Sequence, residues 1–132
     1  MIILTEKQII DLHADLIDNT GGTIGIRDGS LLSSAINSPF ITFDGKFVYT
    51  AIEDMAAKLA VSLAKNHAFL DGNKRIAAHI LNIFLFLNGI TLNYTQNELT
   101  DLFIGIASSS YDSDFVNKWI IEHEEVPSEQ VS

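Results

Sequence analysis

The sequence contains no cysteine among its 132 residues, which excludes a disulfide framework and thiolate chemistry and fits a cytoplasmic location. Positive charge is also scarce, because 8 Lys and Arg residues stand against 17 Asp and Glu residues and give a formal net charge of −9. A surface that binds DNA or RNA needs clustered Lys and Arg. We therefore expect no nucleic-acid partner, whereas basic protein partners remain open.

Long apolar runs are missing as well. The longest, Ile76 to Leu87, is interrupted by His79 and Asn82 and is too short to span a membrane. The first residues, Met1 to Glu6, lack the basic region of a signal peptide. Because 47% of the residues are hydrophobic, disorder is not expected. The length then predicts one domain over residues 1–132 with a proper core.

Apolar residues at helical spacing, introduced by capping residues, predict an all-α fold. Capping boxes open three of the expected helices, at Thr5, Thr50 and Thr95. The expected helices cover about Glu6–Asp18, a short segment from Asp28 through Ile36, about Ala51–Asn66, about Asn73–Leu87, a segment from Thr95 to Ala107, and a last one carrying Phe115, Trp119 and Ile120. The acidic tail, about residues 124–132, is expected to be frayed.

Four finer expectations concern one helix and a few individual residues. The helix over 73–87 is apolar nearly all round, so it should be the central buried helix. His13 is expected at the surface or rim of the first helix. Arg27 and Asp28 are expected to form a local ion pair that shapes a turn, and Phe69 to be a core plug that anchors its loop.

One segment breaks the helical pattern. Asp44-Gly45 lies between two aromatic-rich, β-prone runs and predicts a short hairpin, which should lean on the helices because an isolated hairpin is marginal in water. It could be a plain connector or a flap whose edge captures an extended segment of a target protein. We favour the flap, whose target-binding residues would be Ile41, Thr42, Phe43, Lys46 and Phe47.

The polar stretch from His67 to Arg75 runs into the expected central helix. The free N–H groups and the dipole of a helix N-terminus favour an anion. His67 can take a proton near neutral pH, and Asp71 is a hard oxygen ligand suited to Mg²⁺ shared with nucleotide phosphates. The remaining residues suit phosphate binding through backbone N–H groups or cationic side chains, and they are Gly72, Asn73, Lys74 and Arg75. This set predicts phosphoryl or nucleotidyl transfer to a hydroxyl.

The same stretch resembles the signature of the Fic and death-on-curing superfamily, His-Pro-Phe-x-(Asp/Glu)-Gly-Asn-Gly-Arg-x-x-Arg. The chain matches it at His67, Phe69, Asp71, Gly72, Asn73 and Arg75. It departs from the pattern at Ala68, at Lys74 in place of the second Gly, and at Ala78 in place of the last Arg. The Asn-Lys-Arg form resembles the death-on-curing branch, as do residues 26–32 and the segment from Phe47 onward.

The resemblance implies a compact helical Fic-type domain with a central buried helix and a β-hairpin flap. It implies a toxin with a separate antitoxin protein as partner; no match to the inhibitory Fic motif (Ser/Thr)-x-x-x-Glu-(Gly/Asn) is found in the chain. It also implies ATP as co-substrate with Mg²⁺. Fic proteins mostly transfer AMP, whereas the death-on-curing branch is associated with phosphorylation of a translation factor.

We favour phosphoryl transfer over AMP transfer, because Lys74 fills space that glycine leaves open and Ala78 lacks a second phosphate clamp. Two readings of other classes remain. In one, the chain is a non-catalytic module whose hairpin binds a peptide. In the other, His67 and Asp71 are an i,i+4 metal pair of hydrolase type, which Gly72-Asn73 and the lack of an evident third ligand disfavour.

Overall fold

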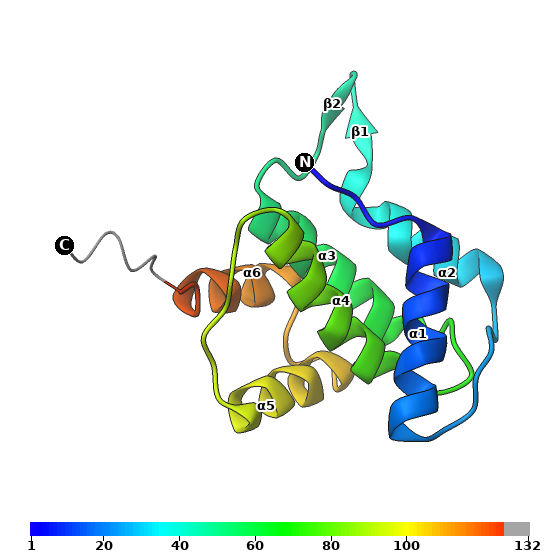
Figure 1. Cartoon of the computed structure of the whole chain (residues 1–132). Helices are drawn as coiled ribbons and strands as arrows, with labels where there is room; N and C mark the ends of the chain where they lie inside the picture. The colour runs from blue at the N-terminus through cyan, green and yellow to red at the C-terminus, as the bar shows by residue number, and fades with distance from the viewer. Residues whose placement is uncertain (126–132) are drawn as a thin grey trace.

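The structure, a computed structural model, describes residues 1–125, and these residues form helices with one small hairpin (Figure 1). The elements in chain order are α1 (Glu6–Thr20), α2 (Gly29–Asn37), the 3₁₀ helix η1 (Ser38–Phe40), β1 (Thr42–Phe43), β2 (Lys46–Phe47), α3 (Ile52–Lys65), α4 (Asn73–Leu87), α5 (Gln96–Ala107) and α6 (Ser113–Glu122). The predicted all-α fold is confirmed. Within the described part of the chain, none of the helices combines the length and hydropathy that a membrane span requires.

The helix starts follow from their capping residues. Thr5 and Thr95 each form the complete capping box that the sequence predicts. The carboxylate of Asp28 accepts hydrogen bonds from the N–H groups of Ser30 and Leu31 and so begins α2. The box predicted at Thr50 is wrong, because the N-cap of α3 is Ala51, which makes no side-chain cap.

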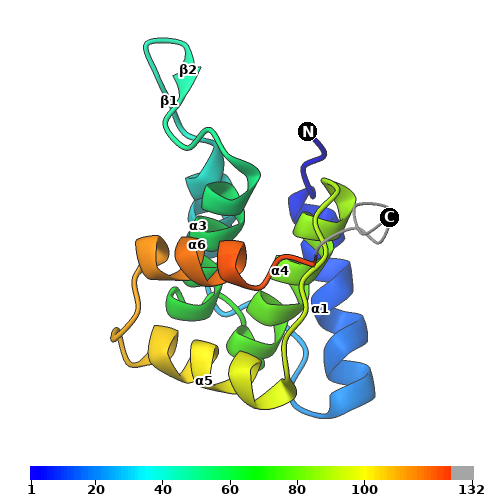
Figure 2. The same cartoon turned by 90° about the vertical axis from the view of Figure 1, so that its left-hand side faces the viewer.

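Helices α3 and α4 share the centre of the fold, with α1 and α2 on one side and α5 and α6 on the other (Figures 1 and 2). Helix α3 packs against α4, and it carries buried alanines such as Ala56 and Ala60, whose small side chains permit a close approach of neighbouring helices. On α4 the buried face includes Ile80 and Phe84, but Phe86 is 70% exposed. The central position of α4 is therefore confirmed, whereas burial all round the helix is not.

A glycine in α5 allows the packing of the turn that follows. A Cβ built on Gly105 would clash with the ring of Tyr111, which stacks on Phe115 with 3.9 Å between ring centroids. Gly105→Ala should therefore destabilise the protein by roughly 1–3 kcal/mol, because the ring must move. Gly29→Ala is the matched control, since a Cβ there meets nothing within 4 Å, and it should be neutral or stabilising in the same thermal unfolding measurement.

The hairpin forms in the predicted place, with Thr42 paired to Phe47 and Phe43 to Lys46. Its turn places Asp44 and Gly45 at φ 54° and 77°, as a two-residue hairpin loop of mirror-image type requires. It does not lean on the helices as expected, because both strands are exposed and project beyond the helical body (Figures 1 and 2). Phe43 is 80% exposed, so this surface has no partner among the described residues.

The chain after α6 is partly held, contrary to the predicted fraying from about residue 124. An isolated antiparallel bridge joins Leu92 to Glu124, and the Glu125 N–H donates to the carbonyl of Thr91 at 2.7 Å. This backbone pairing fixes residues 124 and 125 against the segment between α4 and α5. The rest of the predicted tail, residues 126–132, lies outside the described residues.

The Glu124 side chain gives the fold a pH dependence. Its Oε1 is buried without a hydrogen-bond partner among the described residues. Burial, together with the neighbouring Glu53 carboxylate, raises the pKa of Glu124. A raised pKa means that the folded protein favours the protonated form of Glu124. Protonation therefore adds to the free energy of unfolding. This contribution is complete below the ordinary pKa of a glutamate and is lost as the pH rises through the raised pKa.

Glu124→Gln should therefore raise the melting temperature at pH 7, and the gain over the wild type should shrink as the pH falls toward 4. Thermal unfolding across pH 4–8 measures this. Glu125→Gln is the control, because Glu125 is exposed and one residue away. A gain that is equal at every pH, or equal in both variants, would contradict the explanation.

Candidate active site

The loop between α3 and α4 carries the sequence-predicted site and is held in an unusual backbone conformation. His67 has φ 51° and Gly72 has φ 71°, both in the left-handed region. Non-glycine residues with this geometry cost energy and cluster at functional sites. The Asn73 side chain closes the loop, since its Oδ1 accepts from the Phe69 N–H at 3.0 Å and its Nδ2 donates to the Phe69 carbonyl at 3.1 Å. Asn73 thus fixes the loop through its side chain, whereas Gly72 is the residue before α4 that adopts the left-handed conformation.

A second segment, residues 25–28, clamps this loop from outside. The N–H groups of Arg27 and Asp28 donate to the Ala68 carbonyl, and the Leu70 N–H donates to the Gly25 carbonyl. The Arg27 side chain donates from Nε to the His67 carbonyl at 2.6 Å. The predicted Arg27–Asp28 ion pair is absent from the described residues, because Arg27 fixes the loop while Asp28 caps α2. Arg27 is thus a positioning residue of this site.

His13 of α1 supports the loop from the core side, and its predicted surface position is wrong. The residue is 1% exposed, and its ring stacks on Phe69 with 3.8 Å between centroids. Its Nε2 lies 2.8 Å from the backbone carbonyl of Asp71, which accepts the hydrogen bond. Phe69 is itself 2% exposed, so its predicted role as a core plug is confirmed. The role of His13 at this site follows from its contact with Asp71, which is distant in sequence. The signal for it in the sequence is a histidine among the apolar positions of a helix, which indicates a buried partner.

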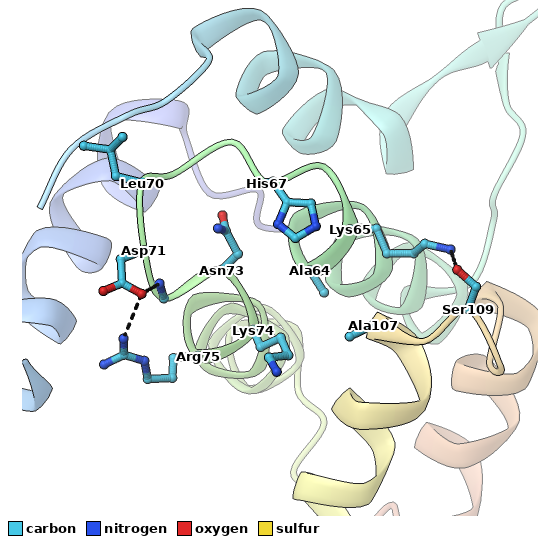
Figure 3. A pocket seen from close by; sticks show the side chains of 11 residues that line it. Ala64, Lys65, His67, Leu70, Asp71, Asn73, Lys74, Arg75, Ala107 and Ser109 are labelled. Carbon is cyan, nitrogen blue, oxygen red and sulfur yellow. Dashed lines mark hydrogen bonds and ion pairs between the residues drawn. The ribbon is translucent and has the colours of Figure 1, made fainter. Parts of the chain in front are cut away.

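A cavity of about 640 Å³ opens at this loop (Figure 3). Its size falls within the usual range of small-molecule sites. The lining residues come from the end of α3, the loop between α3 and α4 (the motif loop), the start of α4, the end of α5 and the turn after α5, and they are Ala64, Lys65, His67, Leu70, Asp71, Gly72, Asn73, Lys74, Arg75, Ala107 and Ser109. Every predicted catalytic, metal-binding and phosphate-binding residue therefore lines one cavity. The imidazole of His67 is exposed toward it between the two ends of the site (Figure 3).

The predicted flap residues lie elsewhere. None of the hairpin residues 41–47 is among those that line the cavity. The hairpin precedes α3, whereas His67 follows it, and the 14 residues of that helix span roughly 20 Å. Figure 1 shows the hairpin and the start of α4 at opposite ends of the helical body. The structure therefore separates the hairpin from the site that it was expected to serve.

The first turn of α4 offers backbone donors to the cavity. The N-cap, Gly72, makes no side-chain cap, and its own N–H donates to the Asp71 carboxylate at 2.8 Å. Within residues 1–125, the N–H groups of Asn73, Lys74 and Arg75 have no hydrogen-bond acceptor. Unpaired N–H groups at a helix N-terminus, facing a cavity, are suited to an anion. Of the predicted phosphate-binding residues, Gly72 thus has its N–H already paired, whereas the N–H groups of Asn73, Lys74 and Arg75 are free within residues 1–125.

The Arg75 guanidinium already contacts several other groups of the protein. Its guanidinium donates to the Thr20 hydroxyl at 2.7 Å and the Gly21 carbonyl at 2.8 Å, at the end of α1. It also lies 3.5 Å from the Asp71 carboxylate. The side chain therefore ties α1 to the motif as well as lining the cavity. Lys74 is exposed and makes no ion pair with any residue that the structure describes, so it is the freer cation of the two.

Asp71, the predicted metal ligand, lies on the wall of the cavity. Its carboxylate is 46% exposed and is oriented by the N–H groups of Gly72 and Thr23. Among the described residues, no group of three or more His, Cys, Asp or Glu side chains could hold a metal by itself. One exposed carboxylate fits Mg²⁺, which protein sites typically bind through one or two carboxylates plus substrate phosphates. The same finding disfavours a protein-only zinc site at His67 and Asp71.

A loop-bound histidine beside a helix N-terminus and a carboxylate defines a candidate transferase site for phosphate-containing substrates. Comparison with known proteins gives the family. The family model described as Fic/DOC family matches residues 3–85, so the chain belongs to the Fic/DOC family.

Two curated relatives support this assignment. "Toxin Doc" from Mycolicibacterium smegmatis is 38% identical over 98 residues, which are 73% of this chain and 75% of that protein. "Protein kinase doc" from Escherichia phage P1 is 30% identical over 108 residues, which are 80% of this chain and 82% of that protein. The resemblance drawn from the motif is thereby confirmed.

Proposed function

We propose that this protein transfers the γ-phosphoryl group of ATP to a hydroxyl of a target protein and acts as a toxin. The observation that carries the proposal is the gathering of an exposed imidazole, an exposed carboxylate and free helix N-terminal amides around one cavity. Phosphoryl transfer needs mainly positioning and electrostatic stabilisation, together with a base for the attacking hydroxyl. The names of the two relatives, a toxin and a protein kinase, agree with it.

His67 is the general base in this proposal. A ring nitrogen of its imidazole takes the proton of the target Ser, Thr or Tyr hydroxyl while the hydroxyl oxygen bonds to the γ-phosphorus. The bond from that phosphorus to the β–γ bridging oxygen breaks, and ADP leaves. The N–H groups of Asn73 and Lys74 hold phosphate oxygens, and the Lys74 ammonium balances their charge. Arg27 and Asn73 keep the loop in place during the reaction.

Mg²⁺ is the metal that this chemistry would use, and Asp71 would hold it together with the phosphates. The bound ion would supply Lewis-acid stabilisation of phosphate charge. The protein's own contribution is to fix the Asp71 carboxylate, which receives hydrogen bonds from Gly72 and Thr23. His13 adds to this by binding the Asp71 backbone carbonyl.

Two departures from the Fic pattern favour phosphoryl over AMP transfer. Lys74 stands where Fic proteins have glycine, and its side chain adds a charge to the cavity. Ala78 stands where they have a last arginine, and it lines an adjacent small groove of about 210 Å³ with Leu99 and Phe103. The second phosphate clamp of the AMP-transferring pattern is therefore missing at that position.

Labelled ATP tests the proposal. Purified protein is incubated with Mg²⁺, with a translation factor as the target that the family resemblance implies, and with ATP labelled at the α or the γ position. Label from the γ position should appear on the target. Label from the α position would show AMP transfer instead. No label from either, with no binding of ATP, would favour the non-catalytic peptide-binding module.

A toxin of this branch is expected to have an antitoxin. We propose that a separate protein with a segment that folds on binding provides the inhibition. The exposed hairpin, with Phe43 80% exposed, is one surface where such a partner or a target could add a strand. Co-expression with the small protein encoded beside the gene should restore growth, and a lack of any such neighbour would weaken the toxin role.

A further inference from the structure

The positively charged residues of this acidic protein are distributed unevenly. The whole chain has eight Lys and Arg residues and a net charge of −9, yet three of the eight line the cavity at the candidate active site. Two belong to the motif, at Lys74 and Arg75. The third is Lys65, on the last turn of α3, which neither the motif nor the comparisons with relatives single out.

Lys65 has no carboxylate partner among residues 1–125, although acidic residues outnumber basic ones two to one. Its ammonium instead donates to the Ser109 hydroxyl at 2.6 Å. Ser109 itself has φ 62°, a left-handed conformation that is strained for serine. A neutral hydroxyl does not neutralise the ammonium, so the charge of Lys65 remains available to the cavity.

The three cations are arranged across the cavity. Figure 3 shows Arg75 with Asp71 at one end, Lys65 with Ser109 at the other, and His67 and Lys74 between them. A single phosphate at the start of α4 would use only the amides and Lys74. A ligand that also engages Lys65 must carry a second negative group and extend past His67.

We propose that Lys65 is a second phosphate-binding group, which binds the polyphosphate chain of a nucleoside triphosphate and exchanges its Ser109 hydroxyl for a phosphate oxygen. This inference rests on the proposed function and deepens it by naming a residue that selects polyphosphate over monophosphate. An ammonium–phosphate hydrogen bond is charge-assisted and stronger than the ammonium–hydroxyl bond that it replaces.

The test compares the affinities of ATP and AMP, each with Mg²⁺, by isothermal titration calorimetry. Lys65→Ala should weaken ATP binding by about tenfold and change AMP binding by less than about twofold. Lys65→Arg should keep ATP binding within about threefold of the wild type, because the charge remains. Ser109→Ala should bind ATP at least as tightly as the wild type, because only the resting partner is lost.

Lys7→Ala is the matched control, since it removes one positive charge outside the cavity, where Lys7 pairs with Asp11. A purely structural role for Lys65 at the C-terminus of α3 would lower the melting temperature and leave the ratio of ATP to AMP affinity unchanged. If the wild type binds ATP and Lys65→Ala shows the same ratio of ATP to AMP affinity as the wild type, this inference alone is overturned. No ATP binding by the wild type would overturn the proposed function itself.

Discussion

Replacing His67 with alanine is expected to lower the rate of transfer by about 10²–10⁴-fold while leaving ATP·Mg²⁺ affinity nearly unchanged. The imidazole is exposed at the cavity and its ring makes no hydrogen bond within residues 1–125, so its removal costs the fold little. The lost function is proton removal from the target hydroxyl. Single-turnover labelling of the target, together with calorimetry of ATP binding, measures both quantities.

His79→Ala is the control for this experiment. His79 is exposed on α4 and does not line the cavity, so its loss should leave both rate and affinity unchanged. A His67→Ala protein that transfers phosphate within threefold of the wild-type rate would show that another group, or none, acts as the base. A variant that loses ATP binding as well would assign His67 to nucleotide binding.

Replacing His13 with alanine should destabilise the protein by about 3 kcal/mol, because an aromatic ring is deleted from a buried position. For a chain of this length that corresponds to a fall in melting temperature of roughly 10 °C. The ring is 1% exposed, stacks on Phe69 and hydrogen-bonds to the Asp71 carbonyl. Thermal unfolding gives the stability, and the transfer assay shows whether the loop has moved.

His13→Phe separates the two contacts of this side chain. It can keep the ring against Phe69, but it cannot donate to the Asp71 carbonyl. We expect it to be more stable than His13→Ala and still slower in transfer than the wild type, because Asp71 loses its backbone support. Equal stability of His13→Ala and the wild type would contradict the buried position of this ring.

The fold was largely predictable because its signals are local. Capping at Thr5, Asp28 and Thr95 depends on residues at most three positions away, and each cap is present. The hairpin turn needs only Asp44-Gly45. The failure at Thr50 shows the limit of this reasoning, since the chain can begin α3 one residue later without any side-chain cap.

The site was predictable as a set of residues but not as a set of contacts. His67, Asp71 and Lys74 are close in sequence, so a loop entering a helix brings them to one cavity. The contacts of His13 with Asp71 and of Arg27 with His67 join residues 58 and 40 positions apart. Such pairs depend on how α1 and the 25–28 segment pack against the loop, and no local pattern encodes that.

The hairpin illustrates the same distinction at a larger scale. Its formation is local, but its relation to His67 depends on the direction in which α3 runs between them (Figure 1). The helix carries the chain from the hairpin at one end of the body to the motif loop at the other. The sequence therefore predicted the existence of the hairpin and could not predict its distance from the cavity.

Amide NMR of the ¹⁵N-labelled protein during titration with ATP·Mg²⁺ tests the central claim most directly. The backbone N–H signals of Asn73, Lys74 and Arg75 should shift saturably and by more than those of the hairpin, because phosphate oxygens would occupy their free donors. Shifts that are absent, or that are largest outside the lining of this cavity, would contradict a phosphate-binding site at the start of α4.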